Sequence, residues 1–180
     1  KKSEINSTAA VYSAAFNLSS SFPAGNYSIT VTATDSAGFT ANSSSQFEYL
    51  TLTAVDVDAS SIIFYALPGS TYEVVGDNST ATATNITVLN SGNTQLDFDV
   101  WATNFSAGTG FVEASKLQYT FNGNYNDAAF GGNMTNTKAR KDVNLNSGFM
   151  RGLSLKLNLP LATTPGNYSG TISLIAVNSG

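Results

Sequence analysis

The chain of 180 residues contains no cysteine and no histidine. Without these side chains the Ser-His-Asp and Cys-His nucleophile systems cannot be built, and neither can almost any zinc, copper or haem site. Most classes of enzyme chemistry are therefore excluded, and we expect no cofactor. A chain without cysteine fits a reducing cytosol or a prokaryotic surface better than a secreted animal domain, which disulfides usually stabilise.

Charged side chains are also scarce, at 11% of the residues, with 8 basic and 12 acidic groups and a formal net charge of −4. A chain this poor in basic groups has no electrostatic footprint for a phosphate backbone, so we expect no nucleic-acid partner. No apolar run reaches the ~18 residues that a membrane span needs, and no signal peptide opens the chain. We therefore expect a mature protein or an internal fragment without a membrane span.

Uncharged polar residues take the place of charges: serine and threonine together number 44 and asparagine 19. This composition is unlike that of a charged disordered tail or a helical cytosolic protein, and it predicts an extracellular location at a cell surface. Asn-x-Ser/Thr sequons number nine, against roughly five expected from composition. They indicate an N-glycosylated surface protein of archaeal or similar type, although a Ser/Thr/Asn-rich chain can also generate sequons without using them. The nine positions are Asn6, Asn17, Asn26, Asn42, Asn78, Asn85, Asn104, Asn133 and Asn167.

Apolar and polar residues alternate with a period of two along most of the chain, and no convincing helical period occurs. Each alternating run predicts a half-buried strand, and turn signals rich in Gly, Pro and Asn separate the runs. Many short strands with such turns favour an antiparallel β-sandwich or barrel. The expected strands lie within residues 12–18, 27–33, 47–49, 86–88, 96–100, 117–121, 153–161 and 168–174.

One short segment occurs twice: Gly25-Asn26-Tyr27-Ser28 returns as Gly166-Asn167-Tyr168-Ser169, each copy preceded by a proline. The proline and glycine predict a turn, after which the tyrosine enters the sheet. Its ring can then pack inside while its hydroxyl group reaches a neighbouring backbone group. We expect the two copies to mark the ends of two domains.

Residues 23–38, Pro-Ala-Gly-Asn-Tyr-Ser-Ile-Thr-Val-Thr-Ala-Thr-Asp-Ser-Ala-Gly, resemble the penultimate strand and final hairpin of immunoglobulin-like repeats in bacterial and archaeal surface proteins. Asn90-Ser91-Gly92-Asn93 similarly resembles a strand-turn of archaeal envelope and filament β-sandwich domains. The resemblance implies an all-β, antiparallel immunoglobulin-like β-sandwich. A complete repeat needs about seven strands, but we expect only three before residue 51. Residues 1–50 are thus predicted to form a partial domain or donated strands. Residues 51–180 are predicted to form a fuller sandwich, in which residues 55–58 are the entry and residues 64–69 end the first strand.

Three groups of side chains are candidates for chemistry or binding. Asp97 and Asp99 stand two apart on one expected strand, with their carboxylates on the same side about 7 Å apart, a spacing that suits a glycosidase pair but equally a solvated strand face. Trp101 continues that polar face if no bulge intervenes, as a platform for a sugar or a subunit, whereas a bulge would bury it in the core. Asp56 and Asp58, with Asp35, offer oxygen ligands for Ca²⁺ or form a solvated edge.

Residues 122–141 form the longest segment without clear alternation, and such loops are either binding surfaces or flexible connections. Lys138, Arg140 and Lys141 place three of the basic groups of the chain in this segment. A solvated loop is one interpretation of this cluster. The other is a contact with an acidic neighbouring subunit.

Together these patterns predict a non-enzymatic, N-glycosylated structural protein of a prokaryotic, archaeal-type cell surface: a subunit of a surface layer, sheath or filament. Three strands cannot bury both faces of a sheet, so we expect residues 5–20, or the edge they form, to pair with another copy in a head-to-tail polymer. Truncation of a larger repeat protein would also explain why only three strands are expected before residue 51. An adhesin or carbohydrate-binding module that uses Trp101 or the long loop is the alternative function, and a carboxylate-pair enzyme a third.

Overall fold

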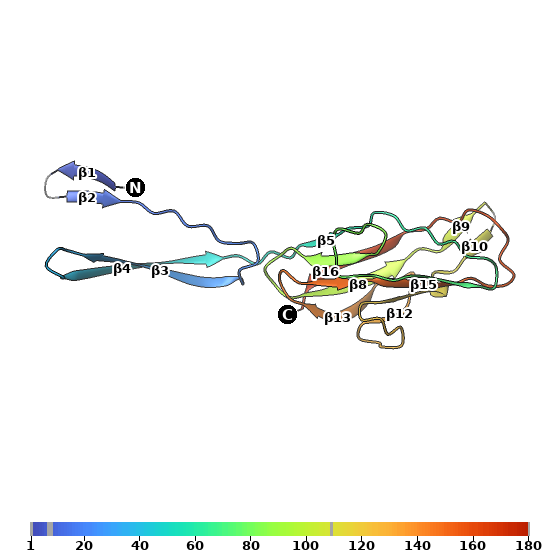
Figure 1. Cartoon of the computed structure of the whole chain (residues 1–180). Helices are drawn as coiled ribbons and strands as arrows, with labels where there is room; N and C mark the ends of the chain where they lie inside the picture. Colours follow the sequence, from blue (N-terminus) through green and yellow to red (C-terminus); the bar gives the residue numbers. More distant parts are fainter. Residues whose placement is uncertain (1, 7–8, 109, 180) are drawn as a thin grey trace.

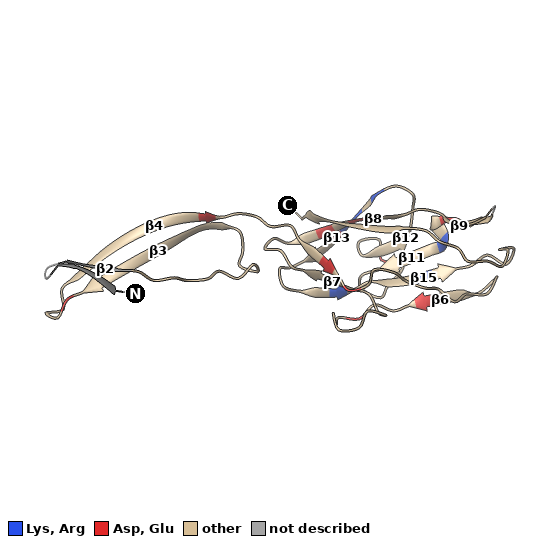
Figure 2. Ribbon diagram, turned by 90° about the horizontal axis from the view of Figure 1, so that it is seen from above, with Lys and Arg blue, Asp and Glu red and all other residues tan. Residues whose placement is uncertain are grey.

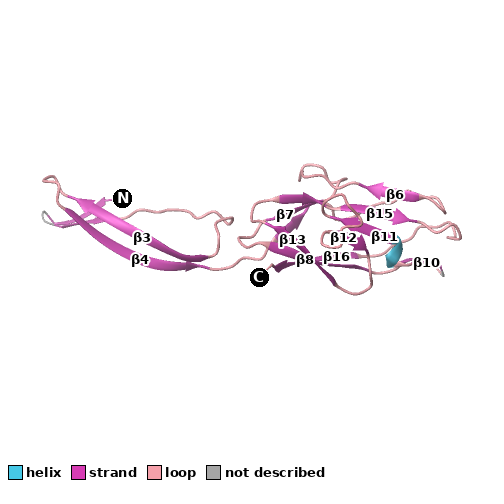
Figure 3. Ribbon diagram, turned by 90° about the horizontal axis from the view of Figure 1, so that it is seen from below, coloured by secondary structure: helices cyan, strands magenta, loops and turns pink. Residues whose placement is uncertain are grey.

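The computed structural model describes residues 2–6, 9–108 and 110–179. Across these residues the chain forms sixteen β-strands and one 3₁₀ turn, Ala114–Lys116, and every strand pairing is antiparallel (Figure 3). The predicted all-β antiparallel fold class is confirmed. The immunoglobulin-like form of the sandwich stays a prediction.

The first four strands lie apart from the rest of the molecule (Figure 1). Strands β1 (Lys2–Asn6) and β2 (Ala9–Tyr12) form one hairpin, and β3 (Gly25–Thr34) and β4 (Thr40–Tyr49) form a longer one. We call residues 2–6 and 9–50 the arm, and the rest of the described chain the body. The arm makes few contacts with the body, such as the 3.2 Å hydrogen bond from the Ser147 hydroxyl group to the Ser21 carbonyl oxygen.

The body consists of two facing layers of sheet. One layer holds the four-stranded sheet β12-β11-β15-β6 and the three-stranded sheet β14-β7-β5, and the other holds the sheet β13-β8-β16, with the hairpin β9–β10 at the end far from the arm (Figure 1). The strands are β5 (Val55–Val57), β6 (Thr71–Val74), β7 (Thr87–Asn90), β8 (Leu96–Ala102), β9 (Phe105–Ala107), β10 (Gly110–Val112), β11 (Leu117–Thr120), β12 (Gly131–Asn133), β13 (Ala139–Leu145), β14 (Met150–Gly152), β15 (Ser154–Asn158) and β16 (Ile172–Asn178).

The hydrophobic core lies between these layers, and all its buried members come from the body. Alternation explains it: Leu96, Phe98 and Val100 of β8 point inward and are at most 1% exposed. They meet Tyr119 and Phe121 from the opposite sheet, and the rings of Phe98 and Phe121 stack with centroids 5.3 Å apart. Burial of the aromatic side chains on both inner faces stabilises the sandwich.

The arm departs from the sequence-based expectation in three ways. It has four strands instead of three, and residues 13–18, predicted to continue a strand, have no regular structure. The inward face expected for Tyr27, Ile29 and Val31 is only half-formed, because Val31 is 62% exposed while the other two are half-buried. The physical reason is that no second layer covers the β3–β4 hairpin.

Two strands of the body are shorter than predicted. The leucine series of residues 153–161 is a strand only to Asn158, and the last strand begins at Ile172, after Tyr168. Residues 64–69 close no strand, since residues 58–70 lack strand structure altogether. These segments make isolated backbone contacts, such as Ser169 with Ser106 and Leu159 with Ser70, instead of the continuous ladder that a strand needs.

Candidate functional sites

The repeated tyrosines make the same contact in the arm and in the body. The hydroxyl group of Tyr27 donates a 2.6 Å hydrogen bond to the carbonyl oxygen of Pro23, and that of Tyr168 donates a 2.8 Å bond to Thr164. In both cases the acceptor lies four residues earlier, across the Pro/Gly turn. The predicted reach of the hydroxyl group to nearby backbone is confirmed, and each tyrosine fixes its turn.

Asp97 and Asp99 share one face of β8, as expected, and Arg140 of β13 lies across both. Its Nε is 2.9 Å from Asp99 Oδ1, and its Nη1 is 3.9 Å from Asp97 Oδ2. The other oxygen of Asp97 accepts the backbone N–H of Asn144 at 2.9 Å. Asn144 has a positive φ of 52° within the irregular stretch of β13. These carboxylates therefore hold the backbone of β13 in place, which is a structural task.

Trp101 follows on the same face of β8, because the register between β8 and β16 runs without a bulge from Leu96 to Ala102. The interpretation that a bulge buries it in the core is wrong: the side chain is half-buried. Lys138 Nζ lies 5.1 Å from the ring centroid and covers one face of the indole by a cation–π contact. A stacking sugar would have to displace that ammonium group or use the other face.

The basic groups of residues 122–141 are all engaged within the chain. Lys138 covers Trp101, Arg140 bridges the two aspartates, and Lys141 Nζ donates a 2.8 Å hydrogen bond to the Ala128 carbonyl oxygen. The three basic side chains considered for contact with an acidic neighbouring subunit therefore each bind a different partner within the chain.

The long loop around these groups is attached to the sheet below it. The Tyr125 hydroxyl group donates a 2.8 Å bond to Glu73, and Lys156 Nζ lies 4.1 Å from the Tyr125 ring centroid. Burial, and then the Glu73 carboxylate, raise the pKa of Tyr125 above its ordinary value. Residues 122–141 also contain the short strand β12 and the start of β13, so the segment is not one continuous irregular loop.

The three aspartates considered for Ca²⁺ do not come together. Asp35 lies in the β3–β4 turn, at the end of the arm far from the body (Figure 1), where it accepts the N–H groups of Ala37 and Phe39. Asp58 Oδ1 accepts the Thr87 N–H at 2.7 Å, and Asp56 is exposed. Among the described residues no group of three or more acidic, histidine or cysteine side chains could hold a metal ion.

Sequence reasoning missed the hydrogen-bond network around Asp77. Its carboxylate accepts the hydroxyl groups of Thr82 and Thr87, the N–H of Ser79 and the amide of Asn85. The hydroxyl donors, Thr82 first and then Thr87, lower the pKa of Asp77 below its ordinary value. The spacing Asp77-x-Ser79 is a signal for an Asx-type turn that could have pointed to it.

The sequon asparagines lie mostly at the surface. Asn6 falls where the structure gives no side-chain description; seven of the other eight are exposed, namely Asn17, Asn26, Asn42, Asn78, Asn104, Asn133 and Asn167. Asn85 differs, because it is half-buried and its own Nδ2, the atom a glycan would take, donates to Asp77.

Three of the exposed asparagines have an anchored amide oxygen. Asn78, Asn104 and Asn133 accept hydrogen bonds from Gly152 N, Ala114 N and Gln118 Nε2, respectively. A fixed oxygen directs the amide nitrogen of each side chain outward. These positions therefore present the reactive group of a glycosylation site at the surface of the body.

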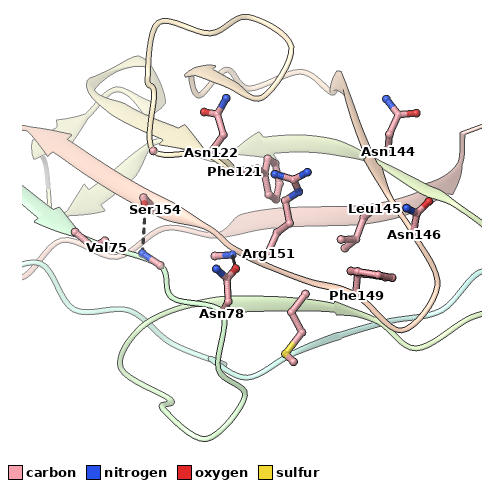
Figure 4. Close-up of a pocket in the computed structure, with 14 residues that line it drawn as sticks. Val75, Asn78, Phe121, Asn122, Asn144, Leu145, Asn146, Phe149, Arg151 and Ser154 are labelled. Carbon is pink, nitrogen blue, oxygen red and sulfur yellow. Dashed lines mark hydrogen bonds between the residues drawn. The ribbon is translucent and has the colours of Figure 1, made fainter.

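A polar hollow of about 510 Å³ lies where the long loop meets strands β14 and β15 (Figure 4). Amide side chains of Asn78, Asn122, Asn144 and Asn146 surround it together with Arg151 and the ring of Phe149, and no carboxylate lines it. Phe149 is 62% exposed. Amides, a guanidinium group and an exposed aromatic ring can together hydrogen-bond and stack on a sugar.

Comparisons with known proteins add little. No family model matches the chain, and no curated protein matches it. A solved structure of a family 123 glycoside hydrolase from Clostridium perfringens is similar at a TM-score of 0.41 and 11% identity, over 62% of this chain and 19% of that one. A likeness this weak carries no argument about function. No helix of the described residues is long and apolar enough to span a membrane.

Proposed function

We propose that the chain is a structural subunit of a prokaryotic, archaeal-type cell surface that assembles with copies of itself through its arm. The observation that carries this proposal is that each hairpin of the arm is a separate two-stranded sheet, with which no third described strand pairs. A two-stranded hairpin is at best marginally stable alone in water. A second polypeptide that covers the arm would supply the missing stabilisation.

Apolar side chains on the arm support the same function. Phe39 at the hairpin turn is 75% exposed, Val31 in the middle of β3 is 62% exposed and Phe16 is 59% exposed. Exposed apolar surface of this extent is typical of protein interaction sites. Figure 2 shows few charged residues along the arm, so nothing in it opposes association with another neutral surface.

The remaining features fit an extracellular, glycosylated and non-enzymatic subunit. Exposed sequons on both arm and body supply attachment points for N-glycans. The only closely spaced carboxylate pair we considered for hydrolysis is bridged by Arg140 and engaged with Asn144. Both carboxylates are therefore occupied by contacts within the chain, which supports a structural role for them.

Sedimentation velocity of the full chain tests this proposal. We expect species that grow in length with concentration, and fibres or sheets in electron micrographs, without any added ligand. The matched variant Val31→Ser, Phe39→Ser removes apolar surface from the arm alone and should shift the distribution toward monomer. A wild-type chain that stays monomeric, with and without its native glycans, would contradict the proposed function.

The hollow of Figure 4 favours a second candidate function, a carbohydrate-binding module or adhesin. Its test is glycan binding by the monomer. Under this alternative Asn146→Ala or Phe149→Ala abolishes a saturable affinity, whereas Trp101→Ala, outside the hollow, leaves it intact. No binding by the wild-type chain to a broad set of glycans removes this candidate.

A further inference from the structure

One side of the body carries an apolar groove of about 890 Å³. Its lining consists of Val57, residues 59–64 and 66–68, inner-face leucines of β15, the first half of β16 and the loop that precedes β16. The groove exposes the core: Leu157, Ile172 and Leu174 point into it and are only half-buried, unlike the fully buried Leu155 beside them. No charged side chain lines the groove.

Residues 59–66, along this groove, have the pattern of a strand but none of its pairing. Ile62, Phe64 and Ala66 are half-buried, while Ile63 and Tyr65 between them are 64% and 75% exposed. No backbone hydrogen bond joins residues 59–66 to the described chain. Eight consecutive residues with unpaired backbone groups beside an apolar groove are a sheet edge without its neighbour.

Strand β16 supplies a second free edge at the same groove. Among the described strands it pairs with β8 alone. Thr103 N–H donates to the Thr171 carbonyl oxygen, and Ser179 N–H donates to that of Gln95. In an antiparallel pair every second residue bonds its neighbour, so the positions that bond β8 are residues 171, 173, 175, 177 and 179. The backbone groups of Ile172, Leu174 and Ala176 therefore point away from β8, toward an unpaired edge.

A segment of matching length and composition is present in the arm, most of it outside any strand. In residues 12–18, Tyr12, Ala14, Phe16 and Leu18 alternate with a Ser, an Ala and an Asn, and residues 13–18 form no strand. The segment has seven residues, the same number as β16, and would extend about 23 Å as a strand. No charged residue occurs from Ile5 to Thr34, which matches the uncharged groove.

We propose that residues 12–18 of a second copy of this chain occupy the groove as an added strand, paired with the free edge of β16. This assignment rests on the proposed self-assembly and names its acceptor site. The added strand would satisfy the backbone edge by hydrogen bonds and cover Ile172 and Leu174 with alternate side chains. Since donor and acceptor are different surfaces, the contact is heterologous and generates a head-to-tail chain.

A second copy is a better donor than the arm of the same chain. Phe16 lies against Phe47, with ring centroids 6.1 Å apart, so residues 13–18 run along the β3–β4 hairpin, which points away from the body (Figure 1). Phe16 remains 59% exposed there, and residues 13–17 are all exposed. The segment is thus weakly held in its own molecule and available to a neighbour.

Proline variants test the assignment in the full chain. Ala14→Pro removes an N–H group from the donor segment, where no regular structure depends on it, and Ala176→Pro removes one from the free edge of β16 without breaking a bond to β8. Ser36→Pro is the control, because position 36 follows Asp35 in the β3–β4 turn and suits proline. A second test of the acceptor compares Leu174→Pro with Leu174→Ala. Both variants lose the leucine side chain, but only the proline variant also loses the backbone N–H group at the edge.

We expect Ala14→Pro and Ala176→Pro each to sediment as folded monomers under conditions where wild type and Ser36→Pro form polymers. Mixed in equal amounts, the two variants should form a one-to-one dimer and nothing longer, because only one donor and one acceptor remain competent. If Ala176→Pro forms polymers to the same extent as wild type, the assignment of the β16 edge as the acceptor is wrong, although self-assembly itself remains supported. A wild-type chain that is always monomeric, including one with residues 12–18 folded into its own groove, would overturn both.

Discussion

Tyr168 and Thr164 are joined across a Pro-Gly turn by a 2.8 Å hydrogen bond from the phenolic hydroxyl group to the backbone carbonyl oxygen. The same bond joins Tyr27 to Pro23 in the arm. Two copies of a four-residue segment thus make the same tyrosine hydrogen bond in two different surroundings. The turn chemistry is local, so it does not depend on whether a complete core surrounds it.

This relationship predicts the effect of removing one oxygen atom. Tyr168→Phe should lower the free energy of unfolding by about 0.5–1.5 kcal/mol, the usual net value of one hydrogen bond. Urea denaturation followed by tryptophan fluorescence measures it. Tyr65→Phe is the control, because Tyr65 is 75% exposed, and we expect it to change stability by less than about 0.5 kcal/mol. Equal effects of the two substitutions would show that the bond does not stabilise the turn.

The second prediction concerns the two carboxylates of β8. Asp97→Ala leaves the Asn144 N–H group without its acceptor and should cost about 1–3 kcal/mol. Asp99→Ala removes a partly exposed ion pair and should cost at most about 1 kcal/mol. Chemical denaturation of both variants gives the comparison. Any hydrolytic activity that Asp97→Asn abolishes would contradict the structural role.

Acid sensitivity is expected from Asp77. Because hydrogen bonds lower its pKa in the folded state, the carboxylate adds stability above its ordinary value of 3.8, and this stability is lost as the pH falls toward the lower folded value. Asp77→Asn should therefore flatten the decline in urea midpoint between about pH 4 and pH 2. Asp142→Asn, at an exposed position, should retain the wild-type decline. Identical curves for wild type and Asp77→Asn would rule out this role.

Glycosylation is the fourth prediction. At least four sequons of the native protein should carry sugar, with Asn78, Asn104 and Asn133 among the best presented, and Asn85 should be bare because its amide is engaged with Asp77. Glycopeptide mass spectrometry of native material measures each site. An intact mass equal to the bare 18.8 kDa chain would contradict the prediction.

The fifth prediction compares two apolar residues that line the groove and differ in burial, Leu155 and Ile172. Leu155→Ala, at a fully buried position, should cost about 2–5 kcal/mol. Ile172→Ala should cost clearly less in the monomer, because that side chain is only half-buried. Calorimetry of the monomeric variants gives both values. A larger loss for Ile172→Ala would mean that the groove is closed in solution.

The body was largely predictable from its sequence because alternation and turn chemistry agree there. Residues 96–100 follow a Gly- and Asn-rich turn and residues 117–121 precede one, and both alternating runs lie in strands with their apolar faces in the core. The face of Trp101 also followed from counting along β8. These features depend on local pattern and on neighbours within the same chain.

What the sequence could not predict depends on contacts between distant segments. Arg140 bridges the aspartates only because β13 pairs with β8, and the network of Asp77 needs the loop that ends at Thr87. Residues 14–18 alternate and residues 59–66 are rich in β-branched and aromatic side chains, but neither segment forms a strand among the described residues. Alternation reports that a segment suits a sheet. It does not report whether its partner belongs to the same molecule.

Electron cryo-microscopy of the assembled full chain tests the central claim most directly. The account predicts filaments or lattices in which each body holds an extra strand beside β16, and whose side-chain density fits Tyr12, Ala14, Phe16 and Leu18 of the neighbouring copy. An assembly in which the groove lined by Ile172 and Leu174 is empty, or is filled by residues of the same chain, would contradict it.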